Sequence, residues 1–333
     1  IEPLKISPKI YISMAQHLGA PANPVVAVGD EVRTGQIIGE PSAFMSCYVH
    51  SSVTGKVVSV GPYKDIAGRE AIHVGIDVSP DGDVWADGII TDNSLDVKFP
   101  KDRQTLLDKI KACGIVGLGG ATFPTHVKLC PPPGSVAECL IINGAECEPY
   151  LTSDYRLMVE RPEEVLTGVA IIKCILGCRA VVGIEENKPK AIESMKKALE
   201  SLSEKNSEFN DIDILTLKKK YPQGGEKQLI AAVLGREVAS GALPISVGAV
   251  VQNVGTALAV YEAVQKNKPL IDNTITVTGQ VSPSQKNYLT RVGTPYKDII
   301  AAAGGLPDGN IKVISGGPMM GRAVSNLDAT TLK

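Results

Sequence analysis

Apolar and polar positions change their spacing along this chain. Between about residues 24 and 78, short runs of Val and Ile alternate with Gly and Pro. This pattern predicts short strands joined by tight turns. From about residue 100, short apolar runs alternate with longer segments in which apolar residues recur at helical spacing. Such alternation predicts strand-helix-strand units and a mostly parallel sheet, as in an α/β domain of the Rossmann-like type.

The elements of this α/β domain can be assigned from the same pattern. Buried strands are predicted over residues 140–143, 180–185 and 212–217, and helices over residues 105–111, 163–176 and 228–234. A further helix is predicted to begin at Pro189. Its apolar stripe is assigned to the core rather than to a binding groove; it consists of Ile192, Met195, Leu199 and Leu202.

Residues 241–261 carry no charged side chain and are long enough to span a bilayer. Pro244, Gly248 and Gln252 interrupt the segment, however, and its hydropathy is modest. A buried strand, a polar turn and a packed helix explain it better. The sequence therefore predicts a soluble protein without a membrane span.

The two ends of the chain are predicted to form β-rich domains. The strand-and-glycine pattern of residues 24–78 resembles the barrel-sandwich (lipoyl-like) family, but its hairpin tip, near residues 44–46, has no Lys that could carry a group. After Pro269, strands are predicted over residues 274–278 and 311–314. Thr294 and Pro295 are the predicted N-cap and first residue of a helix that ends at residues 304–305. This module resembles the β-grasp (SLBB-like) family. The predicted domains are therefore residues 1–98, 99–266 and 267–333.

Composition narrows the possible partners. Hydrophobic residues make up 44% of the 333 residues, charged residues 21%, and the formal net charge is −2. This charge balance lacks the excess of basic residues that binding to nucleic acid requires. Aromatic residues make up 4%, too few for base-stacking platforms. We therefore predict no nucleic-acid partner.

The seven Cys residues form no C-x2-C run, so neither a zinc ribbon nor a ferredoxin-type cluster is predicted, and no metal ligand is assigned. Free thiols in a reducing compartment are the simplest explanation. The chain starts at Ile1 with no basic and apolar leader, so no signal peptide is expected.

Three loops at predicted strand ends carry the candidate chemistry, because ligands of open α/β sheets bind there. In the first loop, residues 117–124, three glycines within four residues let backbone N–H groups approach a phosphate or a flat ring, and Lys128 adds a charge. The string alone is a weak signal. It lacks the spacing of a dinucleotide fingerprint or a P-loop.

The second and third loops are residues 143–150 and 221–227. Asn143 and two Glu side chains could hydrogen-bond the polar edge of a ligand, but a simple turn with solvated carboxylates is about equally compatible with the pattern. The glycine turn of the third loop precedes a helix, whose N-terminus favours anions. Taken in isolation, this loop is better explained as an N-cap turn.

Together, the segments GLGGATFPTHVK, NGAECEP, YPQGGEKQL and VVQNVGTA resemble the FMN- and NADH-binding subunit of respiratory complex I. They resemble the C subunit of Rnf electron-transport complexes more closely, and the resemblance covers all three predicted domains. It implies non-covalent FMN, NAD(H) as substrate, and hydride transfer from NADH to FMN with no side chain assigned as catalytic. Electrons would pass to iron–sulfur clusters and ferredoxin.

The resemblance also implies roles for individual residues. Those matched to the FMN site are Gly117, Gly119, Gly120, Lys128, Asn143, Glu146, Tyr221, Gly224, Gly225, Gln252 and Asn253. Those matched to the NADH site are Phe123, Glu148 and Glu226. Three positions depart from the complex I pattern and are expected to affect NADH more than FMN: Thr122, Ala145 and Gly225.

The resemblance further implies membrane subunits of an Rnf complex as partners and a peripheral position on the cytoplasmic face of the bacterial membrane. The two [4Fe–4S] clusters of the family are expected in a segment that this sequence does not contain. Two alternatives remain open. One is a microcompartment cobalamin reductase with the same domain order, and the other is a non-catalytic scaffold. The convergent glycine loops argue against the scaffold.

Overall fold

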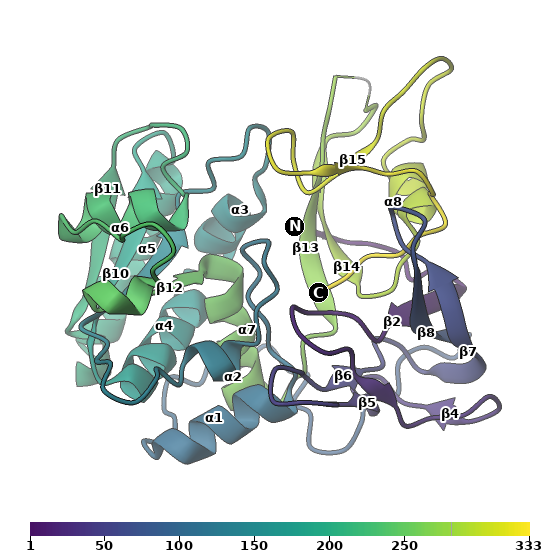
Figure 1. Cartoon of the computed structure of the whole chain (residues 1–333), viewed down its shortest axis with the longest axis horizontal. Helices are drawn as coiled ribbons and strands as arrows, with labels where there is room; N and C mark the ends of the chain where they lie inside the picture. The colour runs from purple at the N-terminus through teal and green to yellow at the C-terminus, as the bar shows by residue number, and fades with distance from the viewer. Residues whose placement is uncertain (281) are drawn as a thin grey trace.

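A four-stranded parallel sheet forms the centre of the helical half of the molecule (Figure 1). In this computed structural model, which describes residues 1–280 and 282–333, its strands are β9 (Cys139–Gly144), β10 (Arg179–Glu185), β11 (Ile212–Leu217) and β12 (Ala249–Asn253). The order across the sheet is β11-β10-β9-β12. The first strand of this sheet in chain order thus lies between the second and the fourth. The strand order reverses between β9 and β12, a position where α/β sheets open a crevice at their carboxyl ends.

Alternating residues of these strands bury opposite faces of the sheet. Leu140 and Ile142 contact the larger core, whereas Cys139 and Ile141 contact the smaller one. The helices that contribute to the larger core are α1 (Arg103–Ala112), α3 (Ser153–Glu160), α4 (Pro162–Leu176), α5 (Pro189–Ser203) and α7 (Val254–Lys266). Helix α6 (Glu226–Leu234) covers the other face with the 3-10 turn η2 (Pro244–Val247). The α/β prediction is confirmed.

The N-terminal strands form two small antiparallel sheets around a core of their own. One sheet contains β2 (Lys9–Ser13), β8 (Glu70–Val78), β7 (Gly55–Lys64) and β4 (Glu31–Val32), and the other contains β3 (Asn23–Pro24), β5 (Ile37–Glu40) and β6 (Val49–His50). Phe44, in the loop between β5 and β6, is exposed. The predicted barrel-sandwich architecture is confirmed.

The C-terminal part pairs with the start of the chain. β13 (Asp272–Val277) and β14 (Lys286–Arg291) form an antiparallel pair, and β1 (Glu2–Pro3) joins β14 in parallel. Helix α8 (Tyr296–Ala302) and the short pair β15 (Ile314–Ser315) and β16 (Arg322–Ala323) follow. The remaining elements are α2 (Thr125–Lys128) and η1 (Ser207–Phe209).

Most predicted elements are confirmed, and the exceptions have local causes. The strand predicted over residues 311–314 is wrong except at its end, because only Ile314 and Ser315 pair with β16. Pro295 is the N-cap of α8 rather than its first residue. Within residues 241–261, the predicted buried strand and packed helix are confirmed as β12 and the start of α7, and the 3-10 turn η2 before the strand was not predicted. In the described part of the chain, no helix is long and apolar enough to cross a membrane.

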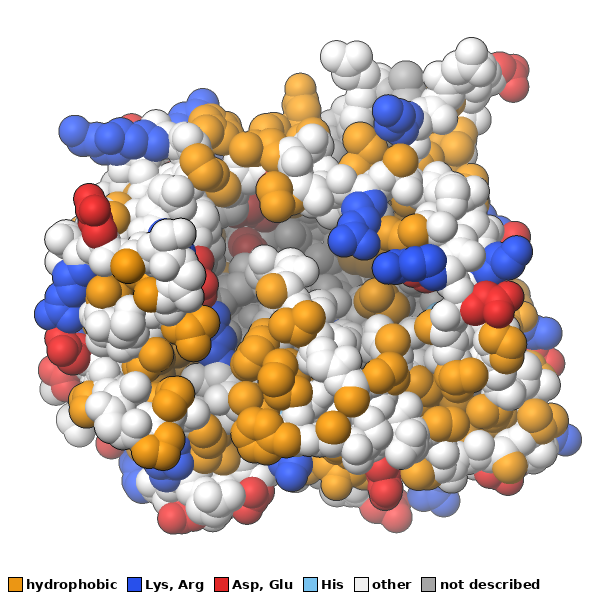
Figure 2. Space-filling model, viewed as in Figure 1, with side chains coloured by type: hydrophobic (Ala, Val, Ile, Leu, Met, Phe, Trp, Pro, Cys, Tyr) orange, Lys and Arg blue, Asp and Glu red, His pale blue; other side chains and the backbone are white. Residues whose placement is uncertain are grey.

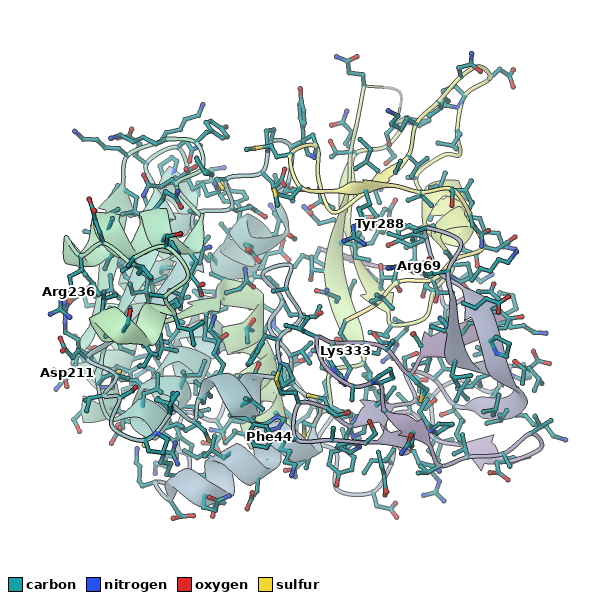
Figure 3. All side chains as sticks on the ribbon, in the orientation of Figure 1. Phe44, Arg69, Asp211, Arg236, Tyr288 and Lys333 are labelled. Atoms are coloured by element: carbon teal, nitrogen blue, oxygen red, sulfur yellow. The ribbon has the colours of Figure 1, made fainter. Side chains whose placement is uncertain are left out.

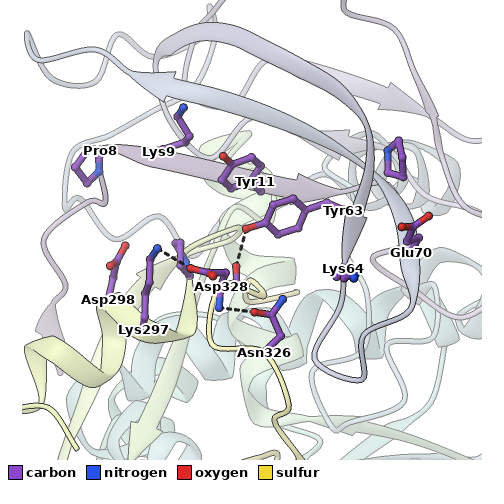
Figure 4. Close-up of a pocket in the computed structure, with 12 residues that line it drawn as sticks. Pro8, Lys9, Tyr11, Tyr63, Lys64, Glu70, Lys297, Asp298, Asn326 and Asp328 are labelled. Carbon is purple, nitrogen blue, oxygen red and sulfur yellow. Dashed lines mark hydrogen bonds and ion pairs between the residues drawn. The ribbon is translucent and has the colours of Figure 1, made fainter.

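A pocket of about 700 Å³ lies between the barrel-sandwich strands and α8, away from the ends of the parallel sheet (Figure 4). Tyr11 and Tyr63 stack there with ring centroids 4.3 Å apart. Its polar groups are largely partnered, since Lys297 pairs with Asp328 at 2.6 Å and the Tyr63 hydroxyl donates to the Asp328 carbonyl at 2.9 Å. We interpret this pocket as part of the interface between the barrel-sandwich domain and the C-terminal domain.

Candidate cofactor site

Asn143 is the next-to-last residue of β9, and Asn253 is the last residue of β12. The two residues pair across the sheet where the strand order reverses. The face of the molecule is hollowed between the helical half and the strand-rich half, and acidic side chains lie inside this hollow (Figure 2). The carboxyl ends of the parallel strands therefore lie at the position where an α/β sheet binds its ligand.

The two ends of the glycine loop, residues 117–123, are joined by hydrogen bonds, and its middle is open to solvent. The Gly117 N–H donates to the Phe123 carbonyl at 2.9 Å, and Val116 pairs with Pro124. Gly120 has φ +104°, a conformation that favours glycine, and a Cβ built there would meet nothing within 4 Å. The loop thus leaves space for a ligand above its backbone.

The glycine loop is fixed to the N-terminus of α7. The Leu118 N–H donates to Thr256 Oγ1 at 2.9 Å, and a Cβ on Gly119 would lie 3.5 Å from the Asn253 Cβ. Asn253 is the N-cap of α7, and its Oδ1 accepts from the Gly255 N–H at 2.7 Å. The predicted first loop and the predicted amide pair are therefore adjacent.

Asn143 joins the second and third predicted loops. Its Nδ2 donates to the Gly224 carbonyl at 2.8 Å, and its Oδ1 accepts from the Ala145 N–H at 3.2 Å. A Cβ on Gly224 would lie 3.1 Å from Cys147 Sγ, so glycine permits this close approach of the two loops. Gly225 is the N-cap of α6, and Tyr221 is exposed at the rim.

Gln252 is buried on β12, and its Nε2 has no hydrogen-bond partner among the described residues. A buried amide donor without a partner is costly. A ligand acceptor at this position would satisfy the amide.

Lys128, at the end of α2, follows the glycine loop in the chain, and its Nζ lies 3.0 Å from Glu226 Oε1. Both side chains are partly exposed, so this ion pair contributes little to stability. It brings a residue predicted for FMN together with one predicted for NADH. Phe123, also predicted for NADH, is half-buried in the glycine loop.

Glu146 lies against the start of α3. Its carboxylate accepts from the backbone N–H groups of Asp154 at 2.8 Å and Tyr155 at 3.1 Å. Burial raises the pKa of Glu146, while these two hydrogen bonds and Lys188 oppose the shift. Lys188 Nζ also donates to the Ala145 carbonyl at 2.6 Å, which holds the second loop in place.

Sequence reasoning missed Asp154 and Lys188. Asp154 Oδ2 accepts from Asn253 Nδ2 at 2.7 Å, which connects Glu146 and α3 to the glycine loop. Burial, followed by the nearby Glu146 charge, raises the pKa of Asp154 to about 7. No motif marks either residue, because Asp154 resembles an ordinary first-turn acid of α3, and Lys188 is a polar residue in a turn.

Glu148 points to the C-terminal part instead of toward Glu226. Its two carboxylate oxygens accept from the backbone N–H groups of Met319 at 2.9 Å and Met320 at 2.8 Å. A Cβ on Gly317 would lie 2.9 Å from this carboxylate. The predicted NADH residue therefore fastens the β15–β16 turn to the central domain.

Replacing Glu148 with alanine is expected to release that turn. Hydrogen bonds from backbone N–H groups to a carboxylate each contribute on the order of 1.5 kcal/mol. Allowing for partial exposure, we expect amide exchange at Met319 and Met320 to accelerate about tenfold. Hydrogen–deuterium exchange of peptides spanning residues 314–323 measures this. Glu138→Ala, which breaks the surface pair with Arg236, is the control. Equal exchange in both variants would contradict the role of Glu148.

The described residues contain no group of three His, Cys, Asp or Glu side chains placed to hold a metal ion. A parallel sheet with a glycine loop and two amides where the strand order reverses places the chain among the α/β proteins, which bind ligands at this point of the sheet.

Comparison with known proteins identifies the family. Residues 110–262 match the Nuo51 FMN-binding domain, residues 1–83 the RnfC barrel sandwich hybrid domain, and residues 274–323 the SLBB domain. The chain is 48% identical to the C subunit of the proton-translocating ferredoxin:NAD(+) oxidoreductase complex of Clostridium ljungdahlii, covering 100% of this chain and 71% of that relative. It is 42% identical to the C subunit of the Na(+)-translocating complex of Acetobacterium woodii, covering 94% of this chain and 68% of that relative.

The chain therefore belongs to the Rnf family, as a C subunit of the ion-translocating ferredoxin:NAD(+) oxidoreductase complexes. Its fold is also similar to a crystal structure of an NAD+-reducing [NiFe]-hydrogenase in the H2-reduced state, with a TM-score of 0.58 over 70% of this chain and 47% of that chain. At 22% identity this likeness concerns the fold alone. The predicted family and the three predicted fold types are confirmed.

Proposed function

We propose that the chain binds FMN non-covalently at the carboxyl ends of β9 and β12 and passes hydride between NAD(H) and FMN. The observation that carries the proposal is the meeting of the glycine loop, Asn143 and Asn253 where the strand order reverses. The match of residues 110–262 to an FMN-binding domain supports it.

The residues at this site fit FMN. The open space above Gly120 suits a flat ring or a phosphate, and the Gln252 amide needs an acceptor. Bound FMN would accept hydride from NADH and release electrons singly. The protein would hold and orient the two nucleotides, with Gln252 and Asn253 toward the phosphate end of FMN. Phe123 and Glu226 would face NADH.

The partners follow from the relatives. We propose that the chain works with the other subunits of an Rnf-type complex, peripherally on the cytoplasmic face of the membrane, with ferredoxin as the electron partner. Electrons would go on to [4Fe–4S] clusters, for which the described residues offer no ligand group.

Titration of the protein into FMN, followed by anaerobic addition of NADH, tests the proposal. We expect quenching of flavin fluorescence on binding and bleaching of the oxidised flavin absorption band with NADH. Quenching without bleaching would contradict the NADH part only. A complete lack of quenching would contradict flavin binding and favour the scaffold.

Gly120→Ala is expected to weaken FMN binding at least about tenfold, because the new Cβ enters the open space above the loop. The fluorescence titration measures this effect. Gly134→Ala is a matched control, since Gly134 also has a positive φ and open space around its Cα but lies in a turn elsewhere. Both variants bear a similar backbone cost of about 1–2 kcal/mol. Equal FMN affinity in the two variants would place FMN away from the glycine loop.

A further inference from the structure

Two carboxyl groups lie together beside the glycine loop, and the proposed hydride transfer gives neither of them a role. Glu146 lies in the loop after β9, and Asp154 is in the first turn of α3. The Asp154 backbone N–H donates to Glu146, so the two residues belong to one hydrogen-bonded unit. Like charges this close disfavour each other, and a pair of this kind titrates as a unit.

Few charges compensate for this pair. Lys188, from the turn before α5, is the cation that acts on both carboxyl groups. Its Nζ already donates to the Ala145 carbonyl and lies 3.6 Å from the carboxylate of the buried Glu185. From α7, the neutral amide of Asn253 donates to Asp154. At the other end of α3, Arg161 is engaged by Glu164 and Glu262.

The strands β9 and β13 also pack against α3. β9 has no charged residue, and β13 presents a neutral group. The Thr152 N–H donates to Thr276 Oγ1 at 3.2 Å. Lys188 is therefore shared by Glu146, Asp154 and Glu185. A proton bound to the pair of Glu146 and Asp154 would reduce the excess of negative charge.

We propose that Glu146 and Asp154 form a proton-holding carboxyl pair next to the cofactor site and that FMN binding draws a proton into this pair. The inference rests on the proposed FMN site. Asn253, which we place toward the phosphate end of FMN, donates to Asp154 Oδ2 at 2.7 Å, so the phosphate charge would lie close to this carboxyl group. A negative charge nearby favours the protonated carboxyl.

The direction of the pH dependence follows. The pKa of Asp154, about 7, would rise on FMN binding. Between pH 7 and the raised pKa, FMN binding is accompanied by uptake of up to one proton, so FMN affinity falls by up to about tenfold per pH unit in this range. No covalent step is involved, and the proton comes from solvent.

Isothermal titration calorimetry of FMN binding at pH 7.5, in two buffers of different ionisation enthalpy, measures the protons taken up. We expect the wild-type chain to take up more protons than Asp154→Asn, by up to about one per FMN. Asp211→Asn is the control and should match the wild type, because Asp211 is exposed on the outer side of the helical half (Figure 3). The difference between variants removes the contribution of the FMN phosphate itself.

Equal proton uptake by the wild type and Asp154→Asn between pH 6.5 and 8.5 would overturn the inference and leave FMN binding intact. If Asp154→Asn does not fold, Glu146→Gln replaces it. Removing the Glu146 charge lowers the pKa of Asp154, so proton uptake at pH 7.5 should shrink. Absence of FMN binding by the wild type would overturn both this inference and the proposed function.

Discussion

Gly168→Ala is expected to destabilise the central domain by about 2 kcal/mol and to weaken FMN binding at the same time. Gly168 lies in α4 where this helix crosses α7, and a Cβ built there would overlap backbone atoms of Ala257, lying 2.6 Å from the carbonyl carbon. Because backbone atoms cannot rotate away, the two helices must separate. Overpacking of this kind costs on the order of 3 kcal/mol, and the better helix propensity of alanine returns about 1 kcal/mol.

The functional consequence arises because α7 begins directly after Asn253. A shift of α7 moves this amide relative to the glycine loop. Thermal unfolding should show a melting temperature lowered by roughly 4–8 °C. Gly61→Ala is the control, since Gly61 is in β7 of another domain and has open space around its Cα. A melting temperature of Gly168→Ala equal to that of the control would show that the helices are not packed this closely.

The parallel sheet could be predicted from sequence because its strands are buried on both faces. Such strands are continuous apolar runs, as in Leu140–Ile142 and residues 180–184, and they stand out from the polar helices around them. β14 and α3 were not predicted. β14 (KNYLTR) is mostly polar, and α3 is short and is capped by Glu146 from the preceding loop rather than by its N-cap residue. The pairing of β1 with β14 joins residues almost 290 positions apart, which no local pattern can indicate.

The residues of the candidate site could likewise be predicted from the sequence only in part. Glycines and amides at strand ends could be selected by type and position, and the structure brings Gly119, Asn143 and Asn253 to one place. The partners of acidic side chains depend on tertiary contacts. Glu148 therefore binds a turn formed 171 residues later in the chain, and nothing near it in sequence predicts this contact.

Asn253→Ala is expected to have the largest effect on the proposed FMN site, because one side-chain amide serves two functions. Its Oδ1 caps α7, and its Nδ2 donates to Asp154. Loss of the cap should lower the free energy of unfolding by about 1 kcal/mol. FMN affinity should fall well beyond tenfold, as measured by fluorescence quenching.

Asp102→Ala separates capping from binding. Asp102 caps α1 by accepting from the Thr105 N–H at 2.8 Å, so this variant loses a comparable cap far from the glycine loop. It should be destabilised to a similar extent while binding FMN like the wild type. Asn253→Ala should also raise the pKa of Asp154 further, because the amide that favours its charged form is gone. A folded Asn253→Ala protein with unchanged FMN affinity would show that the cofactor lies elsewhere than at the reversal of strand order between β9 and β12.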